Sequence, residues 1–121
     1  MIKLQQFTFV CAPSMVQHAG VVARDFDVSE IVADYRRKRD LVHQGLRDQY
    51  ELVRPGGAFY CFPKAPWGTA ADFVAEAVKR NVLIIPGSVF SCLDSHFRIS
   101  YAATDETLRR GISILSALAK R

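Results

Sequence analysis

The segment that most restricts the fold is a short alternation of apolar and polar side chains at residues 97–102, Phe-Arg-Ile-Ser-Tyr-Ala. Successive side chains of a β-strand point to opposite faces of the sheet, so we expect Phe97, Ile99 and Tyr101 to face the protein core. Arg98 then lies on the opposite face. Since a guanidinium is rarely buried unless an anion pairs with it, this strand requires an anion near Arg98.

Two kinds of anion could satisfy Arg98. From the residues alone, the simpler hypothesis is a structural ion pair with Asp94, Asp105 or another acidic side chain of the same domain. The alternative is a ligand carboxylate, which the planar guanidinium binds through two parallel hydrogen bonds better than a lysine does.

Helix start signals divide most of the remaining chain. A capping residue followed three positions later by an amide or acidic side chain predicts helix starts at Ser14, Asp27 and Thr69, and Thr104 precedes two acidic residues. The predicted helices cover residues 14–23, residues 27–50, a short segment from Thr69 to a left-handed exit at Asn81, and residues 104–121. Residues 1–13 carry no pattern long enough to assign.

Two further strands are predicted at residues 58–62 and 82–85. Both are apolar throughout, so we expect both of their faces to be covered, with 58–62 as a central strand. The turn before it, Arg54-Pro55-Gly56-Gly57, contains glycines that allow a positive φ. A small three-stranded sheet packed with helices, an α+β fold, is the predicted architecture.

Composition limits the class of protein. The chain has 121 residues, of which 50% are hydrophobic and 23% charged, enough for one core. No apolar run approaches the roughly 20 residues that span a bilayer, and the first residues lack a signal-peptide pattern, so we expect no membrane association and a cytoplasmic location. The net charge of +4 owes much to Arg36-Arg37-Lys38-Arg39, which we interpret as a solvated helix face and not as a nucleic-acid site.

The residues suggest no self-contained active site. The chain has no phosphate-binding loop, dinucleotide motif or His-Glu-x-x-His. Its three cysteines and three histidines are scattered, which indicates reduced thiols and no metal site. Cys92 near His96 could be a nucleophile with its base, but nothing marks the third group that would orient them. We therefore predict no catalytic, cofactor-binding or metal-binding residue within the chain.

Five segments stand in a characteristic order along the chain. They are Gln17-His18-Ala19, Tyr35-Arg36-Arg37-Lys38-Arg39-Asp40, Arg54-Pro55-Gly56-Gly57-Ala58-Phe59-Tyr60, Val82-Leu83-Ile84-Ile85-Pro86-Gly87-Ser88-Val89-Phe90 and Phe97-Arg98-Ile99-Ser100-Tyr101-Ala102. Together they resemble the C-terminal small domain of the class I/II aminotransferases, which are fold-type I, pyridoxal-phosphate-dependent enzymes of the aspartate aminotransferase kind. The resemblance covers nearly the whole chain.

The resemblance implies a role for Arg98. In that family the arginine of the Arg-x-Ser-Tyr strand binds the α-carboxylate of the amino-acid substrate, and Arg98 matches it. The ligand carboxylate thus replaces the structural ion pair as our expectation. Phe90 matches the phenylalanine after the family's Pro-Gly loop, and we expect it to border the site as a packing residue.

The resemblance also implies that the cofactor is bound elsewhere. In the family, pyridoxal 5'-phosphate is held by a Schiff-base lysine, an aspartate at the pyridine nitrogen and phosphate-binding groups, all in a preceding large domain. None of the five lysines here has the family's Ser-x-Ser-Lys setting. We therefore interpret the chain as a fragment, with residues 1–13 as the join from the large domain and residues 14–121 as the small domain, inactive and free of cofactor on its own.

The full-length protein is then expected to be a homodimeric aminotransferase that moves an amino group between an amino acid and a 2-oxo acid. Two alternatives remain. A lyase of the same fold type would share this domain. A stand-alone module could instead hold a small carboxylate at Arg98 or an anionic polymer on residues 36–39.

Overall fold

The structure, a computed structural model, describes residues 1–8, 10–92 and 94–120. Phe9, Leu93 and Arg121, which fall in the predicted connecting segment, loop and last helix, lie outside these residues. The chain divides into two compact units, Met1–Glu30 and Ile31–Arg121.

The Met1–Glu30 unit contains helices α1 (Ile2–Thr8) and α2 (Ser14–Arg24), neither of which has a buried residue. Helix α2 confirms the prediction for 14–23, whereas α1 occupies a segment for which the sequence predicted no element. The predicted capping box of α2 does not form. Pro13 is the N-cap without a side-chain bond, and the Gln17 side chain donates instead to the carbonyl of Ala12 at 2.6 Å.

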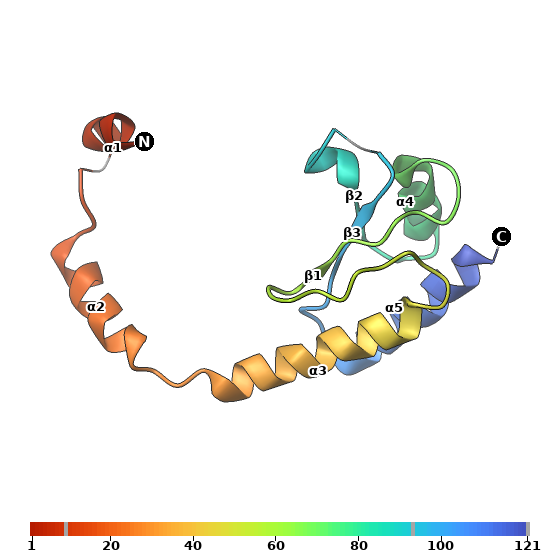
Figure 1. The fold of residues 1–121 in the computed structure, drawn as a ribbon, viewed down its shortest axis with the longest axis horizontal. Coiled ribbons are helices and arrows are strands. Elements are labelled where there is room, and N and C mark those ends of the chain that lie inside the picture. Colours follow the sequence, from red (N-terminus) through yellow and green to blue (C-terminus); the bar gives the residue numbers. More distant parts are fainter. Residues whose placement is uncertain (9, 93, 121) are drawn as a thin grey trace. The chain divides into compact units, whose positions relative to one another are not determined.

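Helix α3 (Ser29–Leu46) is the long helix of the sequence prediction, but it is shorter at both ends than the predicted 27–50 (Figure 1). Asp27 does not cap it through a box with Glu30. Its carboxylate accepts the backbone N–H of Ser29 at 2.9 Å, which forms a local turn before the helix. Val42 and Leu46 are the buried residues of α3, so its C-terminal half contributes to the core.

The sheet has three strands, β1 (Tyr60–Cys61), β2 (Ile85–Pro86) and β3 (Phe97–Ser100), in the order β1-β3-β2. Both pairs are antiparallel, with Tyr60 opposite Ser100 and Ile85 opposite Arg98. Strand β3 is therefore central. The prediction that 58–62 is central with two covered faces is wrong, because this segment pairs on one side only.

The predicted buried strand 82–85 also needs correction. Its sheet pairing is confined to Ile85 and Pro86, and Leu83 is 87% exposed although its neighbour Ile84 is buried. An apolar run is therefore not covered on both faces here. Phe59 and Phe62, at 39% and 41% exposed, show the same for the first strand.

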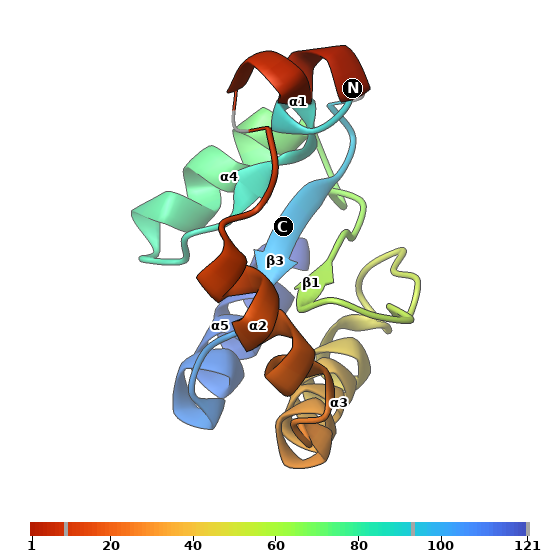
Figure 2. The same cartoon turned by 90° about the vertical axis from the view of Figure 1, so that its left-hand side faces the viewer.

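The core confirms the alternation predicted for residues 97–102. Phe97, Ile99 and Tyr101 are 0%, 8% and 1% exposed, and they pack with side chains from α3, α4 (Ala70–Lys79) and α5 (Asp105–Ala119). Helix α5 lies beside α3 (Figure 2), where the Tyr50 hydroxyl donates to the carbonyl of Leu115 at 2.8 Å. One face of the sheet is thus covered by helices.

Local capping signals near the core were predicted well. Thr69 and Asp72 form the expected capping box of α4, and Thr104 caps α5. Asn81 has the expected positive φ of 60°. The turn before β1 differs, because Ala58 adopts a positive φ of 57° where Gly56 or Gly57 was expected to. Among the described residues, no helix is long and apolar enough to cross a membrane.

Candidate functional site

Arg98 lies on central strand β3, on the face opposite the buried side chains of Phe97 and Ile99, and its own side chain is half-buried. Its guanidinium carbon lies 4.4 Å from the ring centre of Tyr60 and 4.1 Å from the ring centre of Phe90. Both distances are within the range of cation–π contacts, about 6 Å. The candidate site therefore consists of a cation held against two aromatic rings.

The structural ion pair considered for Arg98 does not form. Asp105 binds Arg37 instead, and no ion pair or hydrogen bond between described residues uses the Arg98 guanidinium. Six other described lysines and arginines also lack an ion pair, and all six are exposed: Lys3, Arg36, Arg80, Arg109, Arg110 and Lys120. Within the part of the chain that the structure describes, Arg98 is the one half-buried Lys or Arg without an acidic partner.

Phe90 reaches Arg98 from the segment that follows β2. The 3₁₀ turn η1 (Gly87–Val89) begins where the N–H of Gly87 donates to the carbonyl of His96 at 2.6 Å. The turn ends as the N–H of Phe90 donates to the Gly87 carbonyl at 2.8 Å. A Cβ at position 87 would lie 2.5 Å from the His96 carbonyl oxygen, so only glycine fits this approach.

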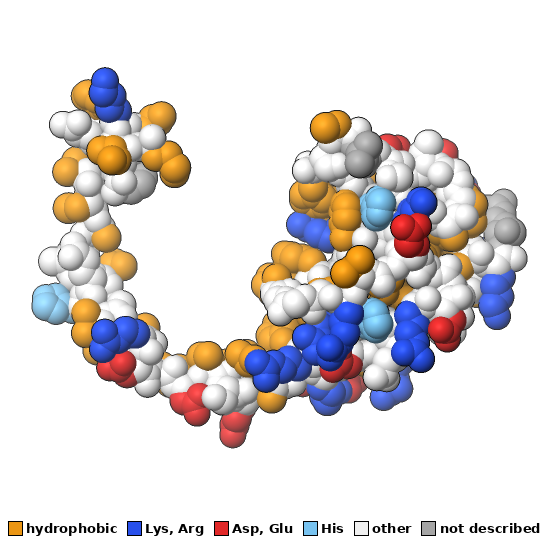
Figure 3. All heavy atoms as spheres, in the orientation of Figure 1, with side chains coloured by type: hydrophobic (Ala, Val, Ile, Leu, Met, Phe, Trp, Pro, Cys, Tyr) orange, Lys and Arg blue, Asp and Glu red, His pale blue; other side chains and the backbone are white. Residues whose placement is uncertain are grey.

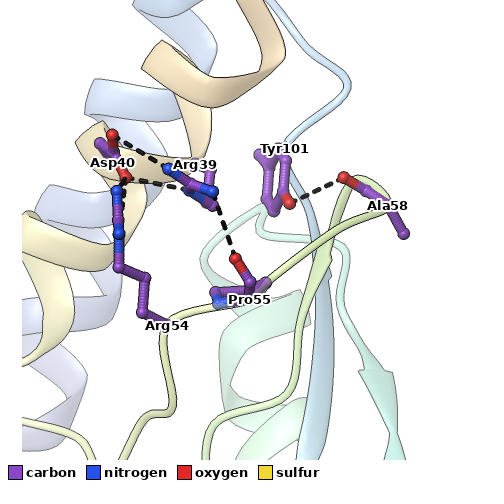
Figure 4. A network of polar contacts seen from close by, with 6 residues as sticks. All are labelled: Arg39, Asp40, Arg54, Pro55, Ala58 and Tyr101. Atoms are coloured by element: carbon purple, nitrogen blue, oxygen red, sulfur yellow. Dashed lines mark hydrogen bonds and ion pairs between the residues drawn. The ribbon is translucent and has the colours of Figure 1, made fainter. Parts of the chain in front are cut away.

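Tyr60 follows a loop that polar contacts fasten to α3 (Figure 4). Asp40 accepts hydrogen bonds from the guanidinium groups of Arg39 and Arg54, each with a contact of 2.9 Å, and Arg39 also donates to the carbonyl of Pro55 at 3.4 Å. The hydrogen bonds from Arg39 and then Arg54 hold the pKa of Asp40 below its usual value. We call this group the Asp40 latch.

A second contact fixes the end of the same loop. The Tyr101 hydroxyl donates to the carbonyl of Ala58 at 2.9 Å, at the residue with positive φ. The ring centres of the neighbouring Phe59 and Tyr60 lie 4.3 Å apart. Tyr60 is consequently positioned by the Asp40 latch before it and by β1 itself.

The surface around Arg98 is largely apolar. Phe62, Ile85 and Phe90 are exposed, and the Phe62 ring stacks on His96 with 5.4 Å between ring centres. Hydrophobic and basic side chains share the exposed surface of the Ile31–Arg121 unit in Figure 3. A ligand at Arg98 would therefore meet a cation within apolar surroundings, where water competes less for the hydrogen bonds.

The basic run of α3 does not form a bare positive patch. Arg37 binds Asp34 and Asp105, Lys38 binds Asp34, and Arg39 binds Asp40. Only Arg36 of the run has no ion pair among the described residues. These partners neutralise most of the charge that an anionic polymer would require.

Other reactive side chains do not form a second site. Cys92 is exposed, and no hydrogen bond between described residues joins it to His96, whose Nδ1 lies 2.9 Å from the Ser95 hydroxyl. Burial raises the pKa of the Cys61 thiol to about 11, which leaves it protonated and unreactive. No cluster of His, Cys, Asp and Glu among the described residues could hold a metal ion.

The described residues do not fit pyridoxal phosphate by themselves. Lys38, Lys64 and Lys79 are held in ion pairs on α3, after β1 and on α4. The other two lysines are exposed, on α1 and just after α5. Among the described residues, the contacts of the Arg98 guanidinium are with aromatic rings and not with a lysine amine.

Comparison with known proteins gives a consistent result. The family described as "Aminotransferase class I and II" matches residues 1–115. A "Probable aspartate aminotransferase" of Methanocaldococcus jannaschii is 29% identical over 98% of this chain and 33% of its own length. A "Probable N-acetyl-LL-diaminopimelate aminotransferase" of Bacillus subtilis is 34% identical over 94% of the chain and 31% of its own length.

Solved structures agree with this. The crystal structure of an aspartate aminotransferase from Thermotoga maritima matches with a TM-score of 0.86 and 26% identity, over 98% of this chain and 32% of that one. An aromatic aminotransferase from Pyrococcus horikoshii gives a TM-score of 0.83 with 29% identity, over 98% of this chain and 34% of that one. The chain thus spans about a third of the length of the relatives that it matches.

Of the residues singled out from the sequence, Arg98 and Phe90 are brought together. Tyr60 was quoted only as part of a motif, and its contact with Arg98 was missed. Tyr60 lies opposite Ser100, so Arg98 is offset from it by two residues along β3 and faces the same side of the sheet. Only the strand register would have indicated this diagonal contact.

Proposed function

The chain belongs to the class I and II aminotransferase family, and from this we propose that its full-length form transfers an amino group between an amino acid and a 2-oxo acid. Pyridoxal 5'-phosphate would be the cofactor, bound by groups outside this chain, because the described lysines do not fit it. In this proposal residues 1–13 join a larger domain and residues 14–121 form the small domain of a cytoplasmic homodimer that acts in amino acid metabolism.

We propose that Arg98 binds the α-carboxylate of the substrate. The observation that supports this most directly is its half-buried guanidinium, which has no acidic partner among the described residues. Five N–H donors in a rigid plane remain available, and a carboxylate can accept two of them at once. Arg98 would then align the substrate for the reaction without itself taking part in proton transfer.

The decisive experiment compares Arg98→Ala with Arg109→Ala in the full-length protein. Removing one partner of a desolvated charge pair costs about 2–5 kcal/mol, so kcat/KM of Arg98→Ala should fall by about 30-fold to a few thousand-fold, with KM raised and kcat lowered. Arg109 is exposed on α5 and has no ion pair among the described residues, so Arg109→Ala should behave like wild type. Unchanged kinetics in Arg98→Ala would refute the assignment.

Reaction type can be tested with the same protein. Every relative named above is an aminotransferase, which favours amino transfer over the lyase chemistry considered from the sequence. Full-length protein should convert a 2-oxo acid to its amino acid in stoichiometric exchange with a donor amino acid. Release of a thiol or of pyruvate without a 2-oxo acid acceptor would support the lyase instead.

The chain by itself should bind no pyridoxal phosphate. After incubation with the cofactor and dialysis, the 121-residue protein should show no absorbance band at wavelengths longer than those at which the protein itself absorbs. A band that persists through dialysis would show that this chain has a site of its own.

A further inference from the structure

We propose that Tyr60 and Phe90 are positioning residues that hold the plane of the Arg98 guanidinium between their rings, so that Arg98 presents only its N–H edge to a ligand. This inference rests on the proposed role of Arg98 in binding a carboxylate. In this proposal the two rings, together with Arg98, make the site specific for a planar anion with two oxygen atoms.

The sheet order brings the two rings to Arg98 from opposite sides. Strand β3 lies between β1, which carries Tyr60, and β2, which leads through η1 to Phe90. Tyr60 pairs with Ser100 and so reaches Arg98 diagonally on the same face. The ring centres lie 4.4 Å and 4.1 Å from the guanidinium carbon.

Aromatic contacts fix a guanidinium in a different way from carboxylates. The negative face of a ring attracts the cation without accepting its in-plane N–H groups as a carboxylate would. Arg37 and Arg39 are held by carboxylates in the same molecule, because their guanidinium N–H groups donate hydrogen bonds to Asp105 and Asp40. Two rings therefore restrain Arg98 while its hydrogen-bond donors stay available.

Each ring is held by a separate part of the chain. Phe90 depends on the close approach of Gly87 to His96, and Tyr60 depends on β1 and on the loop that the Asp40 latch fastens to α3. Neither ring contributes to the buried cluster of the core. Replacing either ring should thus alter Arg98 without unfolding the domain.

The test uses the full-length holoenzyme and two matched pairs of variants. Phe90→Leu and Tyr60→Leu remove a ring, whereas Phe90→Tyr and Tyr60→Phe keep one. Loss of one cation–π contact in a partly desolvated site should lower kcat/KM for an amino acid about tenfold, mainly through KM, and the ring-keeping variants should stay within about twofold of wild type.

A substrate without a carboxylate provides the control. The rate at which each holoenzyme takes the amino group from the amine with the same side chain, but no carboxylate, should not change in the leucine variants. If the leucine variants lose as much activity with the amine as with the amino acid, the rings have a general structural role and the proposal is overturned. Equal rates for leucine and ring-keeping variants would also overturn it.

Arg98→Ala in the same series separates the two proposals. If Arg98→Ala does not discriminate between amino acid and amine, the carboxylate role itself fails. If Arg98→Ala discriminates but both leucine variants match wild type, the carboxylate role stands and the positioning role of the rings fails. Thermal denaturation of every variant checks the fold, and the Phe90 pair alone decides the matter if Tyr60→Leu does not fold.

Discussion

Gly87 offers the sharpest test of how the site is assembled. A Cβ at this position would lie 2.5 Å from the His96 carbonyl oxygen, 3.2 Å from the His96 carbonyl carbon and 3.0 Å from Cζ of Phe62. Two of these neighbours are backbone atoms of the junction into β3, which cannot move aside as a flexible side chain can. Gly87→Ala should therefore force β2 and β3 apart where the Gly87 N–H meets the His96 carbonyl.

The expected loss of stability can be worked out from these contacts. Overpacking costs about 1–3 kcal/mol, and the broken hydrogen bond about 0.5–1.5 kcal/mol. Replacing a glycine restricts the unfolded chain and returns about 0.4–1 kcal/mol. The net loss is about 2 kcal/mol, which should lower the urea midpoint by about 1 M if m is near 2 kcal/mol/M.

Gly111→Ala is the matched control. A Cβ at Gly111 meets no atom within 4 Å, and the residue lies within α5. Alanine should therefore stabilise the helix, by about 0.5–1 kcal/mol. A Gly87→Ala protein with the urea midpoint of wild type, or a Gly111→Ala protein destabilised to the same extent, would refute the packing argument.

Three further predictions concern the stability of the 121-residue chain. Thr69→Ala removes the hydroxyl that accepts the Asp72 N–H at 3.1 Å, so urea denaturation should show a loss of about 1 kcal/mol, and Thr69→Ser should recover most of it. Tyr50→Phe leaves the Leu115 carbonyl without its 2.8 Å donor in the core, and we expect a loss of about 1 kcal/mol in thermal denaturation. Hydrogen bonds from the Thr69 side chain and backbone N–H lower the pKa of Asp72 in the folded chain, so its contribution is present above the unfolded pKa and is lost as the pH falls through the folded pKa. Urea midpoints measured from pH 5 down to pH 2 should consequently fall less steeply in Asp72→Asn than in wild type.

Short sequence patterns correctly predicted the features that depend on residues close together in the chain. The alternation at residues 97–102 correctly identified the buried face of β3, and Thr69 and Thr104 correctly marked two helix starts. The capping box predicted between Ser14 and Gln17 does not form, because the Gln17 side chain donates to the Ala12 carbonyl instead. A spacing of three residues thus predicts a helix start better than it predicts which hydrogen bonds form there.

Strand order could not be derived from the sequence. The run at 58–62 is apolar enough for a central strand, but its position depends on pairing with residues 97–100, far along the chain. Similarly, the positive φ fell on Ala58 and not on the preceding glycines, because the Tyr101 hydroxyl and the Asp40 latch hold the loop at either end. Both outcomes depend on contacts between distant segments.

The candidate site could likewise be predicted only in part from the sequence. Arg98 and Phe90 could be singled out from the alternation and from the motif after Pro86. The second ring, Tyr60, depends on register across β1 and β3, and the Asp40 latch depends on Arg54 returning to α3. Residue types thus indicated the cation, whereas its immediate surroundings required the fold.

The central position of β3 also has a consequence for biosynthesis. Strands β1 and β2 each pair with β3 and not with each other in the described sheet, yet β3 is the last of the three to be made. At about 5–20 residues per second, the ribosome needs roughly 2–8 s to proceed from β1 to the end of β3. Until residues 97–100 are made, neither Tyr60–Cys61 nor Ile85–Pro86 has the strand with which it pairs in the described sheet, so the sheet can form only after β3 is synthesised.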